Sequence, residues 1–89
     1  MREVVYKRQF RRDYRRISKT GRNLARFAEA VSFLQEVGEL PEIYRDHQLI
    51  ENWKDFRECH LGGDFFLIYQ IDDDELILVR IGSHSDLFG

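Results

Sequence analysis

Cysteine is almost absent from this chain of 89 residues, because Cys59 is the only one. A single thiol cannot close an internal disulfide or supply a thiolate cluster for a metal ion, so packing or a partner must hold the fold together. No apolar run approaches the ~18 residues needed to cross a bilayer, and the first residues, MREVVYKRQF, lack the apolar core of a signal peptide. These absences argue against the disulfide-stabilised and membrane-spanning classes, and they favour a cytoplasmic location.

Repeats, low-complexity segments and linkers are absent as well. The composition, with 43% apolar and 34% charged residues, is that of one compact soluble domain over residues 1–89. This length is near the lower end of the size at which a single core sustains a fold. There is room for one functional site, and a core this small favours a stabilising partner.

Positive charge is concentrated at the start of the chain, although the formal net charge is only −2. Residues 1–30 carry ten Lys or Arg and three acidic residues, whereas residues 31–89 carry four and thirteen. A basic segment of this density can bind polyanions or an acidic protein, since each cation placed at a phosphate releases counterions. The alternative is a solvated helix face without a ligand.

The first half of the chain predicts one short strand and two helices. Residues 2–6 indicate a strand, and residues 7–18 place Phe10, Tyr14 and Ile17 on one face of a helix. The solvent side of this helix holds a basic stripe, namely Arg8, Arg12, Arg15 and Lys19, with Arg11 and Arg16 beside it. A second helix is predicted over residues 24–37, because an asparagine cap precedes it and a glycine and a proline follow it.

The second half predicts an antiparallel sheet. Residues 42–52 have no sustained period and indicate a loop. Runs over residues 53–60, 64–71 and 75–81 are typical of strands, joined by Leu-Gly-Gly and by an acidic turn. The run FFLIY is apolar without alternation, which indicates a central strand covered on both faces. Two helices packed on such a sheet make an α+β fold.

His60 and Asp64 flank the Leu-Gly-Gly turn. Paired strands would place these two residues opposite each other, with Cβ atoms about 4.5–5.5 Å apart. A carboxylate beside an imidazole raises its pKa and orients its ring. Polar residues at the ends of a hairpin are also common without a catalytic role, so the pair alone is weak evidence.

Three further residues enlarge the possible cluster. Arg80 follows two leucines on one face of the last strand, and His84 lies about 13 Å further along a straight strand. Both can reach one substrate only if the chain bends near Gly82. His47 lies in the long loop. The alternative for Arg80 is a buried structural arginine that is paired with an acid.

Two kinds of chemistry fit a cluster of His47, His60, His84, Asp64 and Arg80. A metal site is one, but no pair of histidines has the i, i+4 spacing of common zinc signatures, and an arginine opposes a nearby cation. Metal-free phosphodiester cleavage is the other. There a base takes the proton of a ribose 2′-hydroxyl, an arginine stabilises the charge on the phosphate, and an acid protonates the departing 5′-oxygen. Histidine suits both proton roles near neutral pH.

Three segments together resemble the YafQ branch of the RelE superfamily, the toxin components of bacterial type II toxin–antitoxin systems. They are YRDHQL at 44–49, WKDFRECHLGGDFFLIYQID at 53–72 and LVRIGSHSDLF at 78–88, about half of the chain. The resemblance implies an α+β, RelE-like fold of order β-α-α-β-β-β, with two helices packed against a curled antiparallel sheet. It also implies a ribosome-dependent endoribonuclease that cuts messenger RNA in the decoding site and needs no metal or cofactor.

The resemblance assigns a role to each candidate. The acid–base residues of the family match four positions, namely His47, His60, Asp64 and His84. Arg80 matches the arginine at the scissile phosphate, and Phe88 matches the aromatic residue that holds the substrate base, a role that suits an exposed ring. The alternative for Phe88 is a hydrophobic plug at the sheet edge. The basic stripe Arg8, Arg12, Arg15 and Lys19 is expected to face ribosomal RNA.

A cognate antitoxin is the other implied partner. It would neutralise the toxin by wrapping it in a hetero-oligomer, in which operator DNA is contacted mainly through the antitoxin. Two rival hypotheses stay open. A non-catalytic module with the same fold would bind an antitoxin or RNA and tolerate the loss of all three histidines. A metal hydrolase would lose activity with a chelator and regain it with zinc or manganese.

Overall fold

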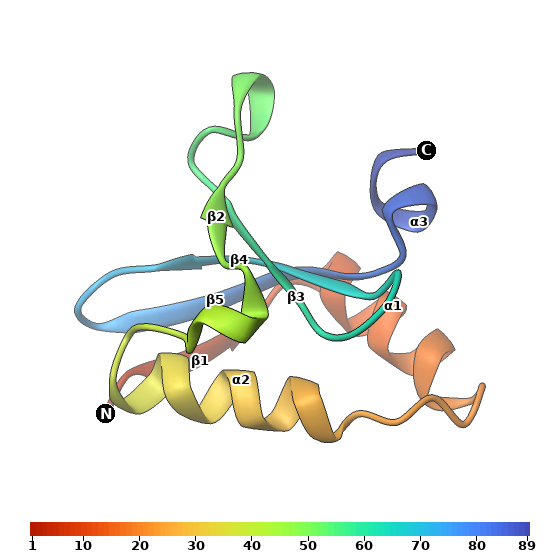
Figure 1. Ribbon diagram of the computed structural model, residues 1–89, viewed down its shortest axis with the longest axis horizontal. Helices are drawn as coiled ribbons and strands as arrows, with labels where there is room; N and C mark the ends of the chain where they lie inside the picture. The colour runs from red at the N-terminus through yellow and green to blue at the C-terminus, as the bar shows by residue number, and fades with distance from the viewer.

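A computed structural model describes all 89 residues and shows a five-stranded sheet with helices on both sides (Figure 1). The elements follow one another as β1 (Glu3–Tyr6), α1 (Arg8–Ser18), α2 (Ala25–Glu36), η1 (Glu42–Tyr44), β2 (His47–Gln48), η2 (Glu51–Trp53), β3 (Arg57–His60), β4 (Phe66–Ile71), β5 (Glu75–Gly82) and α3 (His84–Phe88). The elements η1 and η2 are single 3₁₀ turns. No helix is long and apolar enough to span a bilayer.

The strand order across the sheet is β1-β5-β4-β3-β2. The meander of β3, β4 and β5 is antiparallel, as predicted, and β2, which was not predicted, pairs antiparallel with β3. The strand β1, however, pairs in parallel with β5, from Glu3 opposite Glu75 to Tyr6 opposite Leu78. The chain between β1 and the meander supplies the long connection that a parallel neighbour needs. The α+β class and the helices packed on a sheet are therefore confirmed, but the sheet is mixed rather than wholly antiparallel.

Local residues set the helix ends where the sequence predicted them. The Oδ1 atom of Asn23 accepts the backbone N–H of Ala25 at 2.8 Å, at the start of α2. Gly38 adopts a left-handed φ of 87°, and its N–H donates to the carbonyl oxygen of Phe33 at the end of that helix. Both helix ends thus satisfy backbone groups that would otherwise lack partners.

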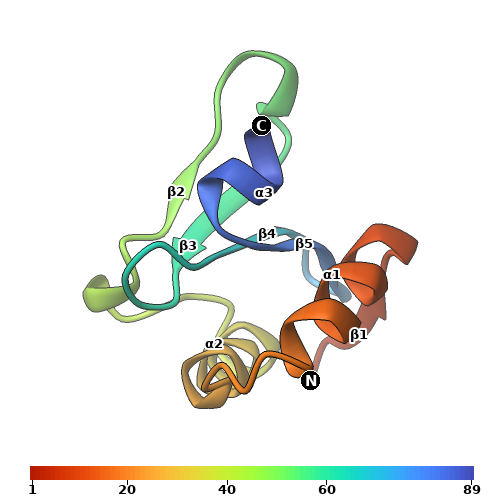
Figure 2. The same cartoon turned by 90° about the vertical axis from the view of Figure 1, so that its right-hand side faces the viewer.

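Side chains pack on both faces of the sheet. The larger core lies on the side of α1 and α2 and includes Leu67 and Tyr69 of β4. On the opposite face, Phe66 and Ile68 of β4 pack with Leu87 of α3. Successive residues of β4 thus enter different clusters, which confirms that this strand is covered on both faces. Figure 2 shows α3 on the opposite side of the sheet from α2, and this side carries the candidate site.

Two segments are more regular than predicted. Residues 42–52 were expected to be a loop, yet they contain η1, β2 and η2, and β2 pairs with β3 through His47 opposite Glu58. A strand of two residues is too short for alternation to appear in a sequence. The helix α3 was not predicted either. It begins with a capping box, in which the Ser83 hydroxyl accepts the Asp86 N–H and the Asp86 carboxylate accepts the Ser83 N–H.

Candidate active site

One face of the sheet carries a row of residues across four strands, of which those on β2, β3 and β5 are polar. The register places His47 of β2 opposite Glu58 of β3. Glu58 is opposite Ile68 of β4, which in turn is opposite Arg80 of β5. His60 lies two residues after Glu58 and therefore points to the same face. Because neighbouring strands are about 4.8 Å apart, residues distant in sequence come within reach of one substrate.

Glu58 connects two of the histidines. Its side chain is 3% exposed and lies 3.0 Å from His84 Nε2 and 3.3 Å from His47 Nε2. The other ring nitrogen of His47, Nδ1, lies 2.9 Å from the carbonyl oxygen of Arg45. When the Nε2–H of His84 donates to Glu58, its Nδ1 atom is left to exchange a proton with a substrate. A buried carboxylate therefore orients both rings.

Phe66 forms an apolar floor beneath the imidazoles. The His84 ring stacks on the Phe66 ring with centroids 3.7 Å apart and planes 2° from parallel. The His60 ring meets the same phenyl ring nearly edge-on at 4.7 Å, and it lies 6.1 Å from the His47 ring. The structure thus brings together the three histidines that the sequence singled out.

Desolvation gives His60 a distinct electrostatic setting. Burial is the largest influence and lowers the pKa of His60 below its ordinary value of 6.5, although the Glu58 carboxylate acts in the opposite direction. The ring is therefore mostly neutral at neutral pH and able to accept a proton. As the pH falls through 6.5, the unfolded chain takes up this proton before the folded one, so His60 lowers the stability of the fold on acidification.

The predicted pairing of His60 with Asp64 across the hairpin is wrong. His60 is opposite Phe66, and the N–H of Leu61 donates to the carbonyl oxygen four residues later at 2.8 Å. Two glycines with φ of 114° and 56° allow this wide turn, because they have no Cβ atom. Asp64 still reaches the cluster by another route, since its Oδ1 atom accepts the backbone N–H of His84 at 3.1 Å.

The chain bends at Gly82. This is the bend that Arg80 and His84 need if both are to reach one substrate. Gly82 ends β5 with φ of 156°, and α3 starts two residues later. A Cβ atom at Gly82 would lie 3.1 Å from the Cβ and Oδ2 atoms of Asp86, so a larger residue would push α3 away. At the other end of α3, the Phe88 ring is 5.6 Å from the ring of His84. The bend therefore returns an aromatic ring to the histidine cluster.

Phe88 also contacts the segment before β3. Its ring lies 5.5 Å from the ring of Trp53, which itself packs against Phe56. Phe88 remains 46% exposed, so the contact leaves much of its surface to solvent. The ring is thus available for stacking and is not a fully buried plug.

Arg80 is held by a buried acid of α1. Its Nε atom donates to Asp13 Oδ2 at 2.7 Å, and its Nη2 atom donates to Asp13 Oδ1 at 3.1 Å. The Nη2 atom also donates to the carbonyl oxygen of Asp86 at 3.4 Å. Asp13 accepts the N–H of Ile81 as well, where β5 extends beyond its partner β1. The structural role that the sequence left open for Arg80 is therefore realised, and the Nη1 atom remains for a ligand.

The basic stripe of α1 faces solvent, as its helical spacing predicted. Arg8, Arg12, Arg15 and Lys19 are all exposed. Arg16 beside them approaches the site, with its Nη2 atom 3.6 Å from Asp86. Contact of the stripe with ribosomal RNA stays a prediction.

The site also contains a possible set of metal ligands. One ligand atom from each of His47, Glu58 and His60 lies within 4.8 Å of the other two. Two imidazole nitrogens and a carboxylate oxygen are donors that zinc and copper accept. The residues therefore fit such an ion in composition. The same groups are the ones that would carry protons in metal-free cleavage.

Sequence reasoning missed two residues of the site, Glu58 and Asp13. Glu58 lies two residues before His60 in a predicted strand, and side chains two residues apart in a strand point to the same face. Asp13 lies three residues after Phe10 on the apolar side of a basic helix, where an acid needs a buried cation. Each residue could have been found by applying strand or helix periodicity to acids as well as to apolar residues.

Replacing Glu58 with glutamine tests its orienting role. The amide keeps the shape of the side chain but can no longer hold both imidazoles as a charged acceptor. For the RNA cleavage that the motifs imply, we expect the rate to fall by about 10–100-fold, the loss typical of residues that orient a metal-bound imidazole. The exposed Glu36 offers a matched control, Glu36→Gln, with wild-type rates expected. Single-turnover RNA cleavage against pH measures both. An unchanged rate and pH profile in Glu58→Gln would show that Glu58 orients nothing.

Comparisons with known proteins match along nearly the whole chain. A family model described as "Bacterial toxin of type II toxin-antitoxin system, YafQ" matches residues 2–89. A protein named mRNA interferase toxin YafQ, from Escherichia coli (strain B / BL21-DE3), is 33% identical over 89 residues, which cover 99% of this chain and 97% of that protein.

Solved structures also match along nearly the whole chain. A chain of the E. coli DinJ-YafQ complex superposes with a TM-score of 0.90 at 32% identity, and each chain is covered to 100%. A copper-bound mutant toxin from Helicobacter pylori superposes with a TM-score of 0.92 at 39% identity, covering 99% of this chain and 100% of that one.

Proposed function

This chain belongs to the YafQ family of toxins of bacterial type II toxin–antitoxin systems, and we propose that it is an mRNA interferase, an endoribonuclease that cleaves messenger RNA on the ribosome. The family resemblance of its motifs is thereby confirmed. The observation that carries the proposed activity is the convergence of His47, His60 and His84 on Glu58 and Phe66. Such a cluster supplies several proton-transfer groups beside one apolar surface.

In the proposed reaction, the 2′-hydroxyl attacks the adjacent phosphorus. A base removes its proton and an acid protonates the departing 5′-oxygen, which leaves a 2′,3′-cyclic phosphate. His84 and Asp64 exchange these protons. His47 and His60 tune or share the roles, and the lowered pKa of His60 keeps that ring ready to accept a proton. The groups are coupled, so the base and the acid are assigned to the cluster rather than to single residues.

Arg80 and Phe88 hold the RNA in this proposal. Because Asp13 fixes two atoms of the Arg80 guanidinium, little side-chain freedom is lost when Nη1 meets the phosphate. The exposed part of the Phe88 ring stacks on a base next to the reacting linkage, a contact worth about 1–3 kcal/mol per base. Phe88 adjoins His84, which places that base at the rim of the cluster.

The partners in this proposal are an antitoxin and the ribosome. DinJ forms a complex with YafQ in the E. coli structure, and a cognate antitoxin would bind this chain in a comparable hetero-oligomer, with operator DNA contacted mainly through the antitoxin. Messenger RNA and ribosomal RNA are the other partners, and they place the protein in the cytoplasm.

The activity is tested by adding the purified protein to ribosomes programmed with a defined messenger RNA and mapping new 5′ ends by primer extension. We expect cleavage in the decoding site and none of the same RNA without ribosomes. A chain that binds its antitoxin yet cleaves neither RNA would be the non-catalytic module instead.

The basic stripe gives a prediction for ribosome binding. A plot of log affinity against log salt concentration has a negative slope. In the double variant Arg8→Gln with Arg12→Gln the magnitude of this slope should be smaller by about 1–2, because two phosphate contacts are lost. Ala28→Glu with Ser32→Glu changes the net charge equally on exposed positions of α2 and should leave the slope unchanged. Co-sedimentation with ribosomes over a series of salt concentrations measures both. Equal slopes in the two variants would make the stripe a solvated face.

Metal-dependent hydrolysis is the second candidate, favoured by the ligand set of His47, Glu58 and His60 and by the copper-bound relative. We expect a chelator of transition metals, used with enough magnesium to keep ribosomes intact, to leave the cleavage rate unchanged. Added Cu²⁺ should lower the rate, because metal ligands must give up their protons and the same groups carry protons in the reaction. Loss of activity on chelation and its recovery with zinc or manganese would establish the hydrolase instead.

A further inference from the structure

A pocket of about 210 Å³ lies where the end of α1 meets the bend between β5 and α3. Two arginines, two hydroxyl groups, one aromatic ring and one carboxylate line most of it, namely Arg16, Arg22, Thr20, Ser83, Phe65 and Asp86. Most of these groups can donate or accept hydrogen bonds. The pocket is therefore polar, and it carries more positive than negative charge.

The pocket adjoins the candidate active site through the chain itself. Phe65 lies between Asp64 and Phe66, and it packs in the larger core whereas Phe66 packs beneath the imidazoles. Ser83 directly precedes His84 at the start of α3. A ligand in the pocket would therefore lie one residue along the chain from groups assigned to RNA cleavage.

Arg16 lies beside Arg80, the arginine proposed to meet the scissile phosphate. The Nη2 atoms of both approach Asp13 Oδ1, at 3.9 Å for Arg16 and 3.1 Å for Arg80. Both also approach Asp86, because Arg16 Nη2 lies 3.6 Å from its Oδ2 atom and Arg80 Nη2 donates to its carbonyl oxygen. The side chain of Arg16 is 51% exposed and can meet a ligand. Two acidic residues thus hold two guanidinium groups side by side.

Arg22 is held by an aromatic ring. Its guanidinium carbon lies over the Phe65 ring, 4.3 Å from the centroid. A planar guanidinium that packs on a ring face keeps its N–H groups for other partners. The Thr20 hydroxyl accepts the backbone N–H of Arg22 at 3.4 Å and donates to the carbonyl oxygen of Ile17 at 2.7 Å. Arg22 is therefore positioned before a ligand arrives, which lowers the entropy lost on binding.

The charges at this end of the sheet favour an anion. Arg16, Arg22 and Arg80 contribute three positive charges, and Asp13 and Asp86 contribute two negative charges, which gives a net charge of +1. Asp13 is buried and bound by Arg80, so its charge does not face the pocket directly. The carboxylate of Asp86 accepts the N–H of Ser83. A group with a single negative charge, such as an RNA phosphodiester, would balance this surface.

We propose that the pocket binds a second phosphate of the messenger RNA, next to the scissile one, through Arg16 and Arg22. The inference rests on the proposed function, because it requires an RNA strand whose scissile phosphate lies at Arg80. Each nucleotide of a strand carries one phosphate, so a strand bound at Arg80 brings a neighbouring phosphate towards the adjoining cations. Phosphate contacts of this kind fix the register of a bound strand.

The first test measures single-turnover cleavage on programmed ribosomes against toxin concentration. In Arg16→Gln with Arg22→Gln, the half-saturating concentration should rise at least about tenfold, because two hydrogen bonds to a charged group are lost. The maximal rate should stay within about threefold of wild type, since the bound linkage does not itself react. Arg22→Gln alone leaves the contacts of Asp13 and Asp86 in place, and it should raise the half-saturating concentration at least about threefold.

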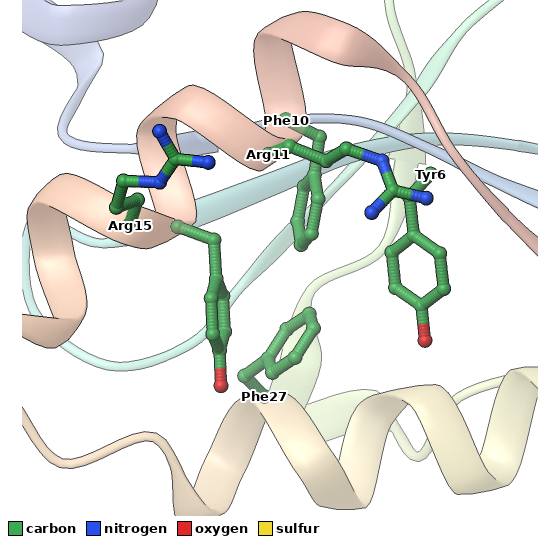
Figure 3. Close-up of a pocket in the computed structure, with 6 residues that line it drawn as sticks. Tyr6, Phe10, Arg11, Arg15 and Phe27 are labelled. Carbon is green, nitrogen blue, oxygen red and sulfur yellow. The ribbon is translucent and has the colours of Figure 1, made fainter.

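Arg11→Gln is the matched control for these variants. It removes an exposed guanidinium of α1 that lies over the Tyr6 ring, at a separate groove between α1 and α2 (Figure 3). The half-saturating concentration should equal that of the wild type. Urea unfolding of every variant checks that the fold is retained.

A messenger RNA with one neutral linkage locates the contacted phosphate. A methylphosphonate replaces the phosphate directly before or directly after the scissile linkage. For the wild-type toxin, one of these RNAs should raise the half-saturating concentration about tenfold. This factor should be at least about fivefold smaller in the double variant, because the contact is already absent. Effects of the linkage on the ribosome are common to both toxins and cancel. Equal factors in the two toxins for both RNAs would overturn the assignment.

Ribosomes without messenger RNA identify the source of the phosphate. The double variant should bind them as Arg11→Gln does, and weaker binding of the double variant alone would assign the pocket to ribosomal RNA and overturn the proposal. Wild-type half-saturating concentrations in Arg22→Gln and in the double variant would overturn it as well, while the proposed function stands. A wild-type toxin that does not cleave RNA on ribosomes would contradict the proposed function and the inference with it.

Discussion

Replacing His84 with alanine or glutamine is expected to abolish growth arrest, with the rate of ribosome-dependent cleavage falling by about 10²–10⁴-fold, the usual contribution of a positioned acid or base. His84 is the ring that joins Glu58, Phe66 and Phe88, so no other histidine takes over its position. Glutamine can still donate to Glu58 but cannot exchange a proton with the substrate. Quench-flow cleavage on programmed ribosomes gives the rate.

Two controls make the His84 result specific. Ser85→Ala changes the next exposed residue of α3 and should keep the wild-type rate. Antitoxin affinity should be unchanged in every His84 variant, which shows that the fold is retained. A fully toxic His84→Ala would refute the proton-transfer scheme.

Replacing Arg80 with alanine is expected to be the most destabilising change in the site. It leaves the carboxylate of Asp13, which is 3% exposed, without the two hydrogen bonds of the Arg80 guanidinium. Only Arg16 then remains near it, with Nη2 3.9 Å from Asp13 Oδ1. Breaking a buried ion pair in this way costs about 3 kcal/mol or more. That is a large part of the roughly 5–15 kcal/mol by which a domain is stabilised. Urea unfolding followed by circular dichroism measures the loss, and cleavage should fall as well.

The double variant Arg80→Ala with Asp13→Asn separates the two roles of the arginine. Asparagine keeps an oxygen for the N–H of Ile81 but carries no charge, so most of the lost stability should return. Cleavage should remain at least about 10²-fold below the wild-type rate, because no guanidinium stabilises the phosphate. A double variant that regains both stability and activity would make Arg80 purely structural.

Much of the fold could be predicted because its signals are local. Helical spacing placed Phe10 and Ile17 inside, and both are buried. Cys59 alternates with His60 along β3, so strand parity puts its side chain on the other face, and it is 0% exposed in the larger core. Burial raises the pKa of this thiol and keeps it protonated and unreactive, so Cys59 acts as a small apolar core residue.

The parts that could not be predicted depend on tertiary context. The parallel pairing of β1 joins segments from the two ends of the chain, and no local pattern encodes it. The register of the hairpin after His60 depends on the backbone angles of Gly62 and Gly63. Glycine permits many such angles, so the sequence does not determine the register. Short elements such as β2 and α3 hold their shape through partners rather than through their own propensity.

The candidate site divides in the same way. The three histidines could be selected as residues that do not fit a core, and the structure brings them together. The contacts among the site residues could not be predicted from the sequence. Glu58 contacts His47 because their strands pair, and Asp13 reaches the site because the backbone N–H of Ile81 in β5 is left free to donate to it. Asp64 shows both outcomes. Its predicted pairing with His60 is wrong, but it does lie beside the cluster, where it accepts the backbone N–H of His84.

The parallel pairing of β1 with β5 also governs when the molecule becomes complete during its synthesis. The strand β1 cannot pair until β5 has been synthesised, because Glu3 is opposite Glu75. Arg80 and His84 come still later in the chain. A nascent polypeptide still lacking β5 and α3 has neither the complete sheet nor Arg80 and His84, two of the residues assigned to RNA cleavage. The ribosome that translates the toxin is therefore not exposed to an active enzyme until β5 and α3 have been synthesised.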